Sequence, residues 1–189
     1  MHLLSYHKTL LTLLAVLLIW PLAGQAADAF PAKQHFAGND LLLNGKGTRT
    51  KLFFNLYNAG LYLSAKNNDA NSILADNQPQ ALRLQITSGQ ITSQKMEAAV
   101  REGFQKSAGA NLANLQARIE QLIAVFKESV QQGDIYDFVY RPQTLVIIKN
   151  GRQAAAIPGV DFKQAFLGIW LGNHPTQSSL KAALLGQGR

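Results

Sequence analysis

Arg49 is the residue of this sequence with the clearest capacity for binding chemistry. It stands just before a long apolar and aromatic run that ends at Leu63. Arginine is permanently charged, and its planar guanidinium suits a carboxylate or a phenolate. Tyr57 lies further along the same run, and its hydroxyl group could donate a second hydrogen bond to the same oxygens. A straight strand would separate the two by about 26 Å, so a bend or bulge would be needed to bring them together.

Other motifs with catalytic or nucleotide-binding potential are incomplete. The segment GKGTR from Gly45 lacks the third glycine of a dinucleotide fingerprint and the Gly-Lys-Ser/Thr of a P-loop, and it leads into a predicted strand. His35 and His174 are the histidines that follow the first 26 residues, and neither has carboxylates at ligand spacing. A hydrolase triad would lack its Gly-x-Ser-x-Gly elbow. We therefore predict no catalytic residue, metal or cofactor.

The composition limits the protein to one domain and suggests an anionic partner. A chain of 189 residues, 47% of them hydrophobic, can form a single domain with its own core. It contains no cysteine, which excludes disulfides and lipidation on cysteine. Its formal charge of +7 suits an anionic small molecule, a lipid headgroup or a polyanion. Because the basic residues are scattered, we expect no nucleic-acid partner.

The first residues have the pattern of an export signal. A short basic start that includes Lys8 precedes the apolar segment Leu10–Trp20, and Pro21 and small residues follow. We therefore predict a cleavable signal peptide over residues 1–26 and a single domain over residues 27–189 in the periplasm. The alternative is an uncleaved N-terminal helix that anchors the protein in a membrane, because this stretch is long and uncharged enough to span a bilayer.

A hairpin is predicted around the candidate site. Asn44–Gly47 has the residues of a tight turn, so the strand Leu41–Leu43 would turn back into the strand Arg49–Leu63. Even positions of the second strand are apolar, whereas odd positions form a mixed face of charge, amide and aromatic groups. The members of the mixed face are Arg49, Lys51, Phe53, Asn55 and Tyr57. Such a face is typical of a cleft, and a solvent-exposed edge is the alternative.

Blocks of strands and helices follow this hairpin. Period-two alternation predicts the strands, and apolar residues at helical spacing predict the helices. The expected strands are 82–87, 135–140, 144–148 and 152–157, and the expected helices are 72–75, 92–109, 112–126, 161–171 and 178–185. Because the blocks do not alternate regularly, we predict an α+β domain with a mainly antiparallel sheet.

Several short segments resemble the chalcone isomerase-like family, in the order that the family has. They are NGKGTR with LYNAGLYL, then LRLQITSGQITSQKMEAAV, and finally FLGIWLGNHPTQSSLKAALL. The likeness covers about residues 41–185. It implies an open-faced β-sandwich, in which helices cover a large antiparallel sheet and a ligand cleft lies between them.

The resemblance to the catalytic members of this family is incomplete at the site. True isomerases hold a phenolate on an arginine, and a threonine, a tyrosine, an asparagine and a late hydroxyl group position substrate and water. Arg49 matches the arginine, whereas Tyr57 takes the place of the first threonine. Ile91, Ala98 and Ile169 replace the tyrosine, the asparagine and the late hydroxyl group. These apolar side chains cannot hydrogen-bond to a developing oxyanion, so we do not expect an enzyme.

The site is more similar to that of non-catalytic members, such as the plant plastid fatty-acid-binding proteins. Those proteins present an arginine and a tyrosine to a fatty acid carboxylate, which implies the same role for Arg49 and Tyr57. The residues expected to line the cleft are Phe53, Ile91, Ala98 and Ile169. We therefore predict an exported, non-enzymatic binder of a fatty acid or similar apolar carboxylate. The alternatives are a protein- or membrane-interaction module with a filled cleft and, third, an isomerase or lyase in the same cleft.

Overall fold

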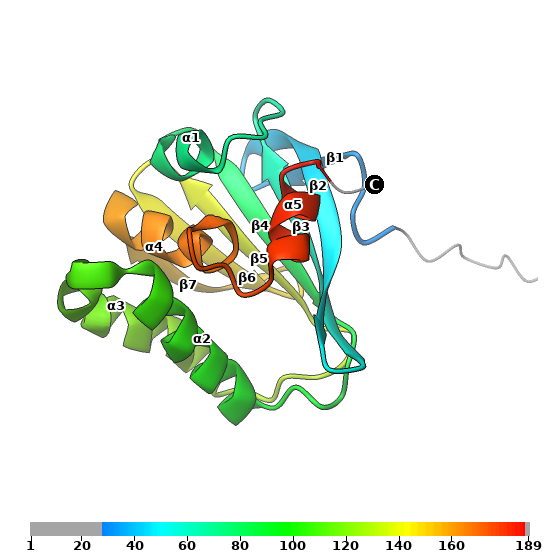
Figure 1. Cartoon of the computed structure of the whole chain (residues 1–189), viewed down its shortest axis with the longest axis vertical. Helices are drawn as coiled ribbons and strands as arrows, with labels where there is room; N and C mark the ends of the chain where they lie inside the picture. Colours follow the sequence, from blue (N-terminus) through cyan, green and yellow to red (C-terminus); the bar gives the residue numbers. More distant parts are fainter. Residues whose placement is uncertain (1–27, 188–189) are drawn as a thin grey trace, which may run out of the picture.

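The sheet is a meander in which each strand pairs with its neighbour in the sequence. In the computed structural model, which describes residues 28–187, seven antiparallel strands lie in the order β1 to β7 (Figure 1). Their bounds are β1 Lys33–Phe36, β2 Asn39–Lys51, β3 Phe54–Leu63, β4 Gln80–Ile86, β5 Ile135–Arg141, β6 Thr144–Lys149 and β7 Arg152–Pro158. The predicted signal peptide, residues 1–26, lies outside the described residues.

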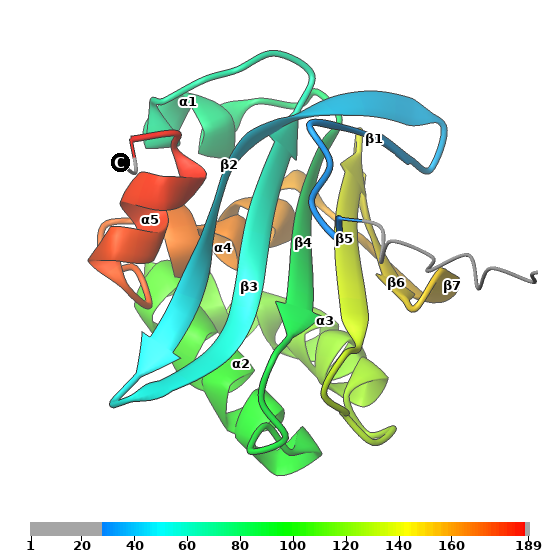
Figure 2. The same cartoon turned by 90° about the vertical axis from the view of Figure 1, so that its right-hand side faces the viewer.

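Helices cover one face of this sheet. Their bounds are α1 Ala70–Ala75, α2 Ser93–Ser107, α3 Leu112–Val125, α4 Val160–Leu171 and α5 Ser178–Leu184, with a 3₁₀ helix at Gly109–Asn111. Figures 1 and 2 show α2, α3 and α4 together on the covered face, while α5 lies beside β2. Between Asp28 and Gln187, no helix combines the length and the apolar character that crossing a bilayer requires. The predicted α+β class and the open-faced β-sandwich, with its antiparallel sheet, are confirmed.

Strand β4 shows how the two faces of the sheet differ. Leu82, Leu84 and Ile86 alternate as predicted and lie in the main core beneath the helices. Arg83 points to the opposite face, where its guanidinium donates to the Asp137 carboxylate over 2.6 and 2.9 Å. The N-terminal segment and β1 cover this second face with a smaller apolar cluster. Apolar and polar residues alternate along β4 because the second face is only partly covered.

The β2–β3 hairpin differs from its prediction. Strand β2 continues without a break through Asn44–Gly47, and the turn lies at Leu52–Phe53. The predicted turn residues instead form a bulge, seen as a register shift between Leu43 and Gly45. The expected strand Arg49–Leu63 is therefore two strands, and the hairpin is longer than the sequence pattern indicated.

Close packing of α5 explains the glycines in the middle of β2. A Cβ atom on Gly45 would lie 2.0 Å from the carbonyl oxygen of Ala183, and one on Gly47 would lie 2.7 Å from the Ala183 Cβ. The buried Asn44 amide donates to the carbonyl oxygen of Leu184 over 2.8 Å. These residues serve the approach of a distant helix to the strand, because only glycine allows such close contact with a backbone.

Helices α2 and α4 also approach each other through glycine. A Cβ atom on Gly103 would lie 2.9 Å from two carbons of Ile169, and one on Gly168 would lie 3.1 Å from the Ser107 Cβ. Helix α2 begins at a cap in which the Thr92 hydroxyl group accepts from the Lys95 backbone N–H over 3.3 Å. The cap fixes where α2 begins, and the glycine contacts fix how closely it packs against α4.

Candidate functional site

Arg49 and Tyr57 are direct partners across the β2–β3 hairpin. The turn at Leu52–Phe53 folds the chain back, so the two residues are neighbours rather than the ends of one strand. Directly opposed residues share a face, and their Cβ atoms lie about 5 Å apart. A register shift beside this pair leaves Leu56 without an opposite residue, and such a bulge bends the hairpin. The hairpin thus brings together the two residues that the sequence analysis singled out.

A cleft of about 570 Å³ lies between this hairpin, α2 and the C-terminal part of α4. Its volume falls in the range of about 300–1,000 Å³ that is usual for small-molecule sites. The apolar part of the lining consists of Leu52, Phe54, Leu56, Ile91, Met96, Ala98, Ala99, Gly103 and Ile169. The polar part consists of Arg49, Lys51, Tyr57, Gln90, Lys95, Glu102, Lys106, His174 and Thr176. The cleft therefore combines an oily surface with several cations.

Most of the predicted site residues line this cleft, and one does not. Those that line it are Arg49, Tyr57, Ile91, Ala98 and Ile169. Phe53 lies in the hairpin turn with 97% of its surface exposed, outside the cleft. The prediction that Phe53 lines the cleft is wrong. It assumed that Arg49 and Phe53 lie on the same face of one strand, but β2 ends at Lys51 and Phe53 lies in the turn.

Part of the α2 surface was missed by the sequence analysis. Met96, Ala99 and Gly103 line the cleft together with Ala98. They recur every three to four residues and so lie on one side of the helix. The available signal was the small size of Ala98, Ala99 and Gly103, since small residues on a helix opposite a hairpin leave space between the two.

The Arg49 guanidinium is oriented by neutral oxygens and keeps its charge uncompensated. Its Nη1 donates to the Thr50 carbonyl oxygen over 2.7 Å and to Gln177 Oε1 over 3.0 Å. The same Gln177 oxygen accepts from the Thr50 backbone N–H over 3.0 Å. Within residues 28–187, Arg49 has no carboxylate in ion-pair contact, and its Nε and Nη2 atoms make no hydrogen bond. The N–H groups of Nε and Nη2 of this half-buried guanidinium thus remain available to a ligand.

The Tyr57 hydroxyl group is held in place by a hydrogen bond and can act as a donor. Trp170 Nε1 donates to the Tyr57 Oη over 2.9 Å, so the phenol oxygen is already an acceptor. Burial raises the pKa of the Tyr57 phenol to about 12, against the smaller opposing effects of the Trp170 hydrogen bond and the Arg49 charge. At physiological pH the phenol is therefore neutral and can donate a hydrogen bond.

Positive charge dominates the rim of the cleft. Glu102 is the acidic residue of the lining, and Lys106 Nζ contacts its carboxylate over 2.5 Å. The hydrogen bond and charge of Lys106, with smaller effects of Lys51 and Arg49, lower the pKa of Glu102. Lys95 adds a further cation. The rim thus retains a net positive charge that would attract an anion.

Comparisons with known proteins identify the family and the fold. The family model of chalcone isomerase-like proteins matches residues 24–186. The chain belongs to the chalcone isomerase-like family. A fatty-acid-binding protein from Arabidopsis thaliana has a similar solved structure, with a TM-score of 0.65 and 15% sequence identity, over 82% of this chain and 90% of that chain. At this identity the likeness shows the fold. A search of curated proteins finds no match.

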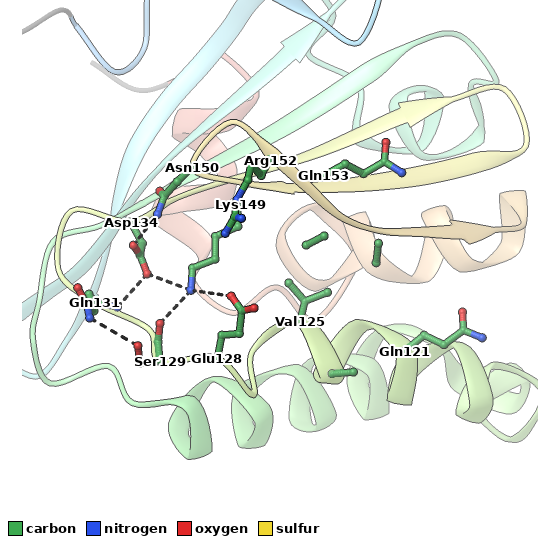
Figure 3. A pocket seen from close by; sticks show the side chains of 13 residues that line it. Gln121, Val125, Glu128, Ser129, Gln131, Asp134, Lys149, Asn150, Arg152 and Gln153 are labelled. Carbon is green, nitrogen blue, oxygen red and sulfur yellow. Dashed lines mark hydrogen bonds and ion pairs between the residues drawn. The ribbon is translucent and has the colours of Figure 1, made fainter.

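This chalcone isomerase-like domain has a second cavity of about 590 Å³, between α3 and the β6–β7 hairpin (Figure 3). Here Lys149 Nζ donates to the Ser129 carbonyl oxygen over 2.9 Å and lies 3.6 and 3.8 Å from the carboxylates of Asp134 and Glu128. The Asn150 amide also donates to Asp134. The half-buried Lys149 of this groove is therefore already paired, whereas Arg152, which also lines the groove, is exposed.

Proposed function

We propose that this protein binds a fatty acid or a similar apolar carboxylate in the cleft beneath the β2–β3 hairpin. The observation behind the proposal is the half-buried Arg49 guanidinium, which has no carboxylate partner among residues 28–187 and borders an apolar surface. An uncompensated charge in such a place is costly, and an anionic ligand would remove the cost. The fatty-acid-binding protein of the same fold supports the same ligand class.

The carboxylate would contact both strands of the hairpin. Arg49 would donate through Nε and Nη2 while Gln177 holds its Nη1, and the Tyr57 hydroxyl group would donate to the same carboxylate. The acyl chain would lie along the apolar lining contributed by Ile91 and Ile169. Because Ile91, Ala98 and Ile169 take the places of the isomerases' tyrosine, asparagine and late hydroxyl group, we infer binding without catalysis.

The proposed location follows from the residues that precede the domain. The signal-like pattern of residues 1–26 supports export to the periplasm, with an uncleaved membrane anchor as the alternative. N-terminal sequencing of the protein recovered from the periplasmic fraction tests this part. A first residue at or near Ala27 supports cleavage, whereas recovery of the intact N-terminus in the membrane fraction supports the anchor.

The cleft is open, which favours a binder over an interaction module with a filled cleft. Native mass spectrometry of the exported protein should detect co-purified fatty acid, and titration with long-chain fatty acids should give the affinity. Arg49→Ala should weaken binding by about 30-fold or more, the value of a charged hydrogen-bonded pair, and Tyr57→Phe by about fivefold.

Arg152→Ala provides the matched control, since Arg152 is an exposed arginine at the other cavity. Its affinity should equal that of the wild type. Equal binding by wild type and Arg49→Ala would refute the assigned carboxylate site. A wild-type protein that binds no fatty acid would refute the proposed function itself.

A further inference from the structure

The tip of the β2–β3 hairpin exposes an apolar cluster. Leu52, Phe53 and Phe54 are 81%, 97% and 47% exposed, and among the described residues Leu42, at 39%, is the remaining large apolar side chain with comparable exposure. Single exposed apolar residues are ordinary on protein surfaces. Three in succession on a projecting turn are not, and such patches usually mark an interaction surface. We call these three residues the hairpin tip.

The backbone conformation of the turn does not require large apolar residues. Leu52 has a φ of 57°, a left-handed conformation that costs a leucine energy and that glycine, asparagine or aspartate would adopt more readily. Phe53 is almost fully exposed and makes no contribution to the core. Neither backbone geometry nor packing therefore accounts for large apolar side chains at the hairpin tip.

The hairpin tip projects away from the rest of the sheet. Strand β4 ends at Ile86, which pairs with Tyr57, whereas β2 and β3 continue to the pair Lys51 and Phe54. Figure 2 shows the hairpin extending beyond the end of β4. Phe53, at the turn, is almost fully exposed and lies outside the cleft, so it suits insertion into a deformable layer.

Cations flank the hairpin tip. Lys51 adjoins it, forms no ion pair within residues 28–187, and lines the cleft together with Lys95 and Lys106. Glu102, the acidic residue of this lining, is already paired with Lys106. Apolar residues bordered by lysines match the interface of an anionic bilayer, where each nearby Lys or Arg strengthens binding by about fivefold.

We propose that the hairpin tip inserts into the surface of an anionic lipid bilayer, with Lys51 and Lys95 on the headgroups. Leu52 and Phe54 also line the cleft, so docking would place the mouth of the cleft against the membrane. A fatty acid could then pass between bilayer and cleft without crossing water. This last step depends on the proposed function, whereas membrane docking itself does not.

The test is co-sedimentation of the exported protein with vesicles of phosphatidylcholine, with and without phosphatidylglycerol. The wild type should bind the vesicles that contain phosphatidylglycerol, and Phe53→Ser should bind them at least about tenfold more weakly. Lys51→Glu should weaken binding by about tenfold or more, because it replaces an attraction by a repulsion. Leu42→Ser is the matched control, since it removes an exposed leucine far along β2 and should leave vesicle binding unchanged.

A second measurement follows insertion directly. The fluorescence of Phe53→Trp should shift to shorter wavelength on addition of anionic vesicles, relative to the wild type. Equal vesicle binding by wild type and Phe53→Ser, an absence of wild-type binding, or an absence of the shift would each overturn the proposal. Dimers in lipid-free solution that depend on Phe53 would overturn it too, because the hairpin tip would then contact a second copy.

The two proposals fail separately. Phe53 lies outside the cleft, so Phe53→Ser should keep the wild-type affinity for a soluble fatty acid. A wild type that binds fatty acid but ignores vesicles would overturn membrane docking alone. A wild type that binds vesicles through the hairpin tip but takes up no fatty acid would overturn the proposed function and leave docking intact.

Discussion

The cleft beneath the β2–β3 hairpin and the groove between α3 and the β6–β7 hairpin have nearly the same volume, about 570 and 590 Å³, but differ in the state of their charges. In the groove, Lys149 is paired with two carboxylates and a carbonyl oxygen. In the cleft, the hydrogen bonds that the Arg49 guanidinium makes within residues 28–187 go to neutral oxygens of Thr50 and Gln177. A charge that is already paired attracts an anionic ligand only weakly, so the volume of a cavity alone is a poor indicator of a binding site.

The two cavities differ in charge because different residues line the side that faces the cation. Across the groove, the segment after α3 supplies Glu128 and Ser129, and the start of β5 is preceded by Asp134, all within reach of Lys149 (Figure 3). Across the cleft, α2 presents Ala98 and Ala99 to the hairpin. Alanine can neither neutralise Arg49 nor fill the space, and the carboxylate that α2 adds to the lining, Glu102, is already paired with Lys106.

Filling each cavity in turn gives the largest expected effect. Ala98→Trp places an indole in the cleft and should weaken fatty-acid binding by about 30-fold, since the acyl chain loses apolar surface to contact. Ala154→Trp does the same in the groove and should leave the affinity unchanged. Both alanines are exposed, so both variants should unfold within about 0.5 kcal/mol of the wild type. Isothermal titration and thermal unfolding measure the two quantities.

Two other outcomes would contradict the assignment of the ligand to the cleft. If Ala154→Trp weakened binding and Ala98→Trp did not, the ligand would lie in the groove despite its paired charges. If both left the affinity unchanged, fatty acid would bind at neither cavity.

The helices and most strands could be predicted because their signals are local. Leu82, Leu84 and Ile86 alternate as a half-buried strand must, and the fold class followed from the order of such elements. The turn predicted at Asn44–Gly47 is wrong, because its glycines allow close packing of α5, which lies far away in the sequence. An Asn-Gly pair has the same composition whether it makes a turn or admits a helix, so single-sequence patterns cannot separate the two.

The site was predictable in its residues but not in its geometry. The resemblance to the family indicated Arg49 and Tyr57, yet their pairing depends on a turn at Leu52–Phe53 that has none of the usual turn residues. The same unusual turn removed Phe53 from the cleft and exposed it. The support that Gln177 and Trp170 give to the pair comes from a distant part of the chain and could not be anticipated from local pattern.

The paired and the free cation can be distinguished by their contributions to stability. Lys149→Met removes the hydrogen bond to Ser129 and the charge beside Asp134, and should lower the free energy of unfolding by about 1–3 kcal/mol. Lys51→Met removes an exposed lysine without an ion pair in the described residues and should change it by less than about 0.5 kcal/mol. Urea denaturation measures both. An equal loss of unfolding free energy in the two variants would mean that Lys51 is paired as fully as Lys149.

The smallest effect concerns pH. Burial alone would raise the pKa of Asp134, but hydrogen bonds from Asn150 and the Gln131 backbone, with the charge of Lys149, outweigh it and lower that pKa. A carboxylate with a lowered folded-state pKa stabilises the protein above its unfolded-state pKa of about 4, and this stabilisation is lost as pH falls through the folded-state value. Asp134→Asn should therefore flatten the acid limb of the stability curve, by about 1 kcal/mol or less.

Glu102→Gln is the matching change in the cleft. The pKa of Glu102 is also lowered, chiefly by the hydrogen bond from Lys106, but that pair is exposed and screened by solvent. Its acid limb should therefore follow the wild type, as measured by urea denaturation at a series of pH values. If Glu102→Gln flattened the limb more than Asp134→Asn, the cleft would hold the stronger internal ion pair. Arg49 and Lys51 would then lie in a field that is already balanced, which would remove the reason for an anionic ligand.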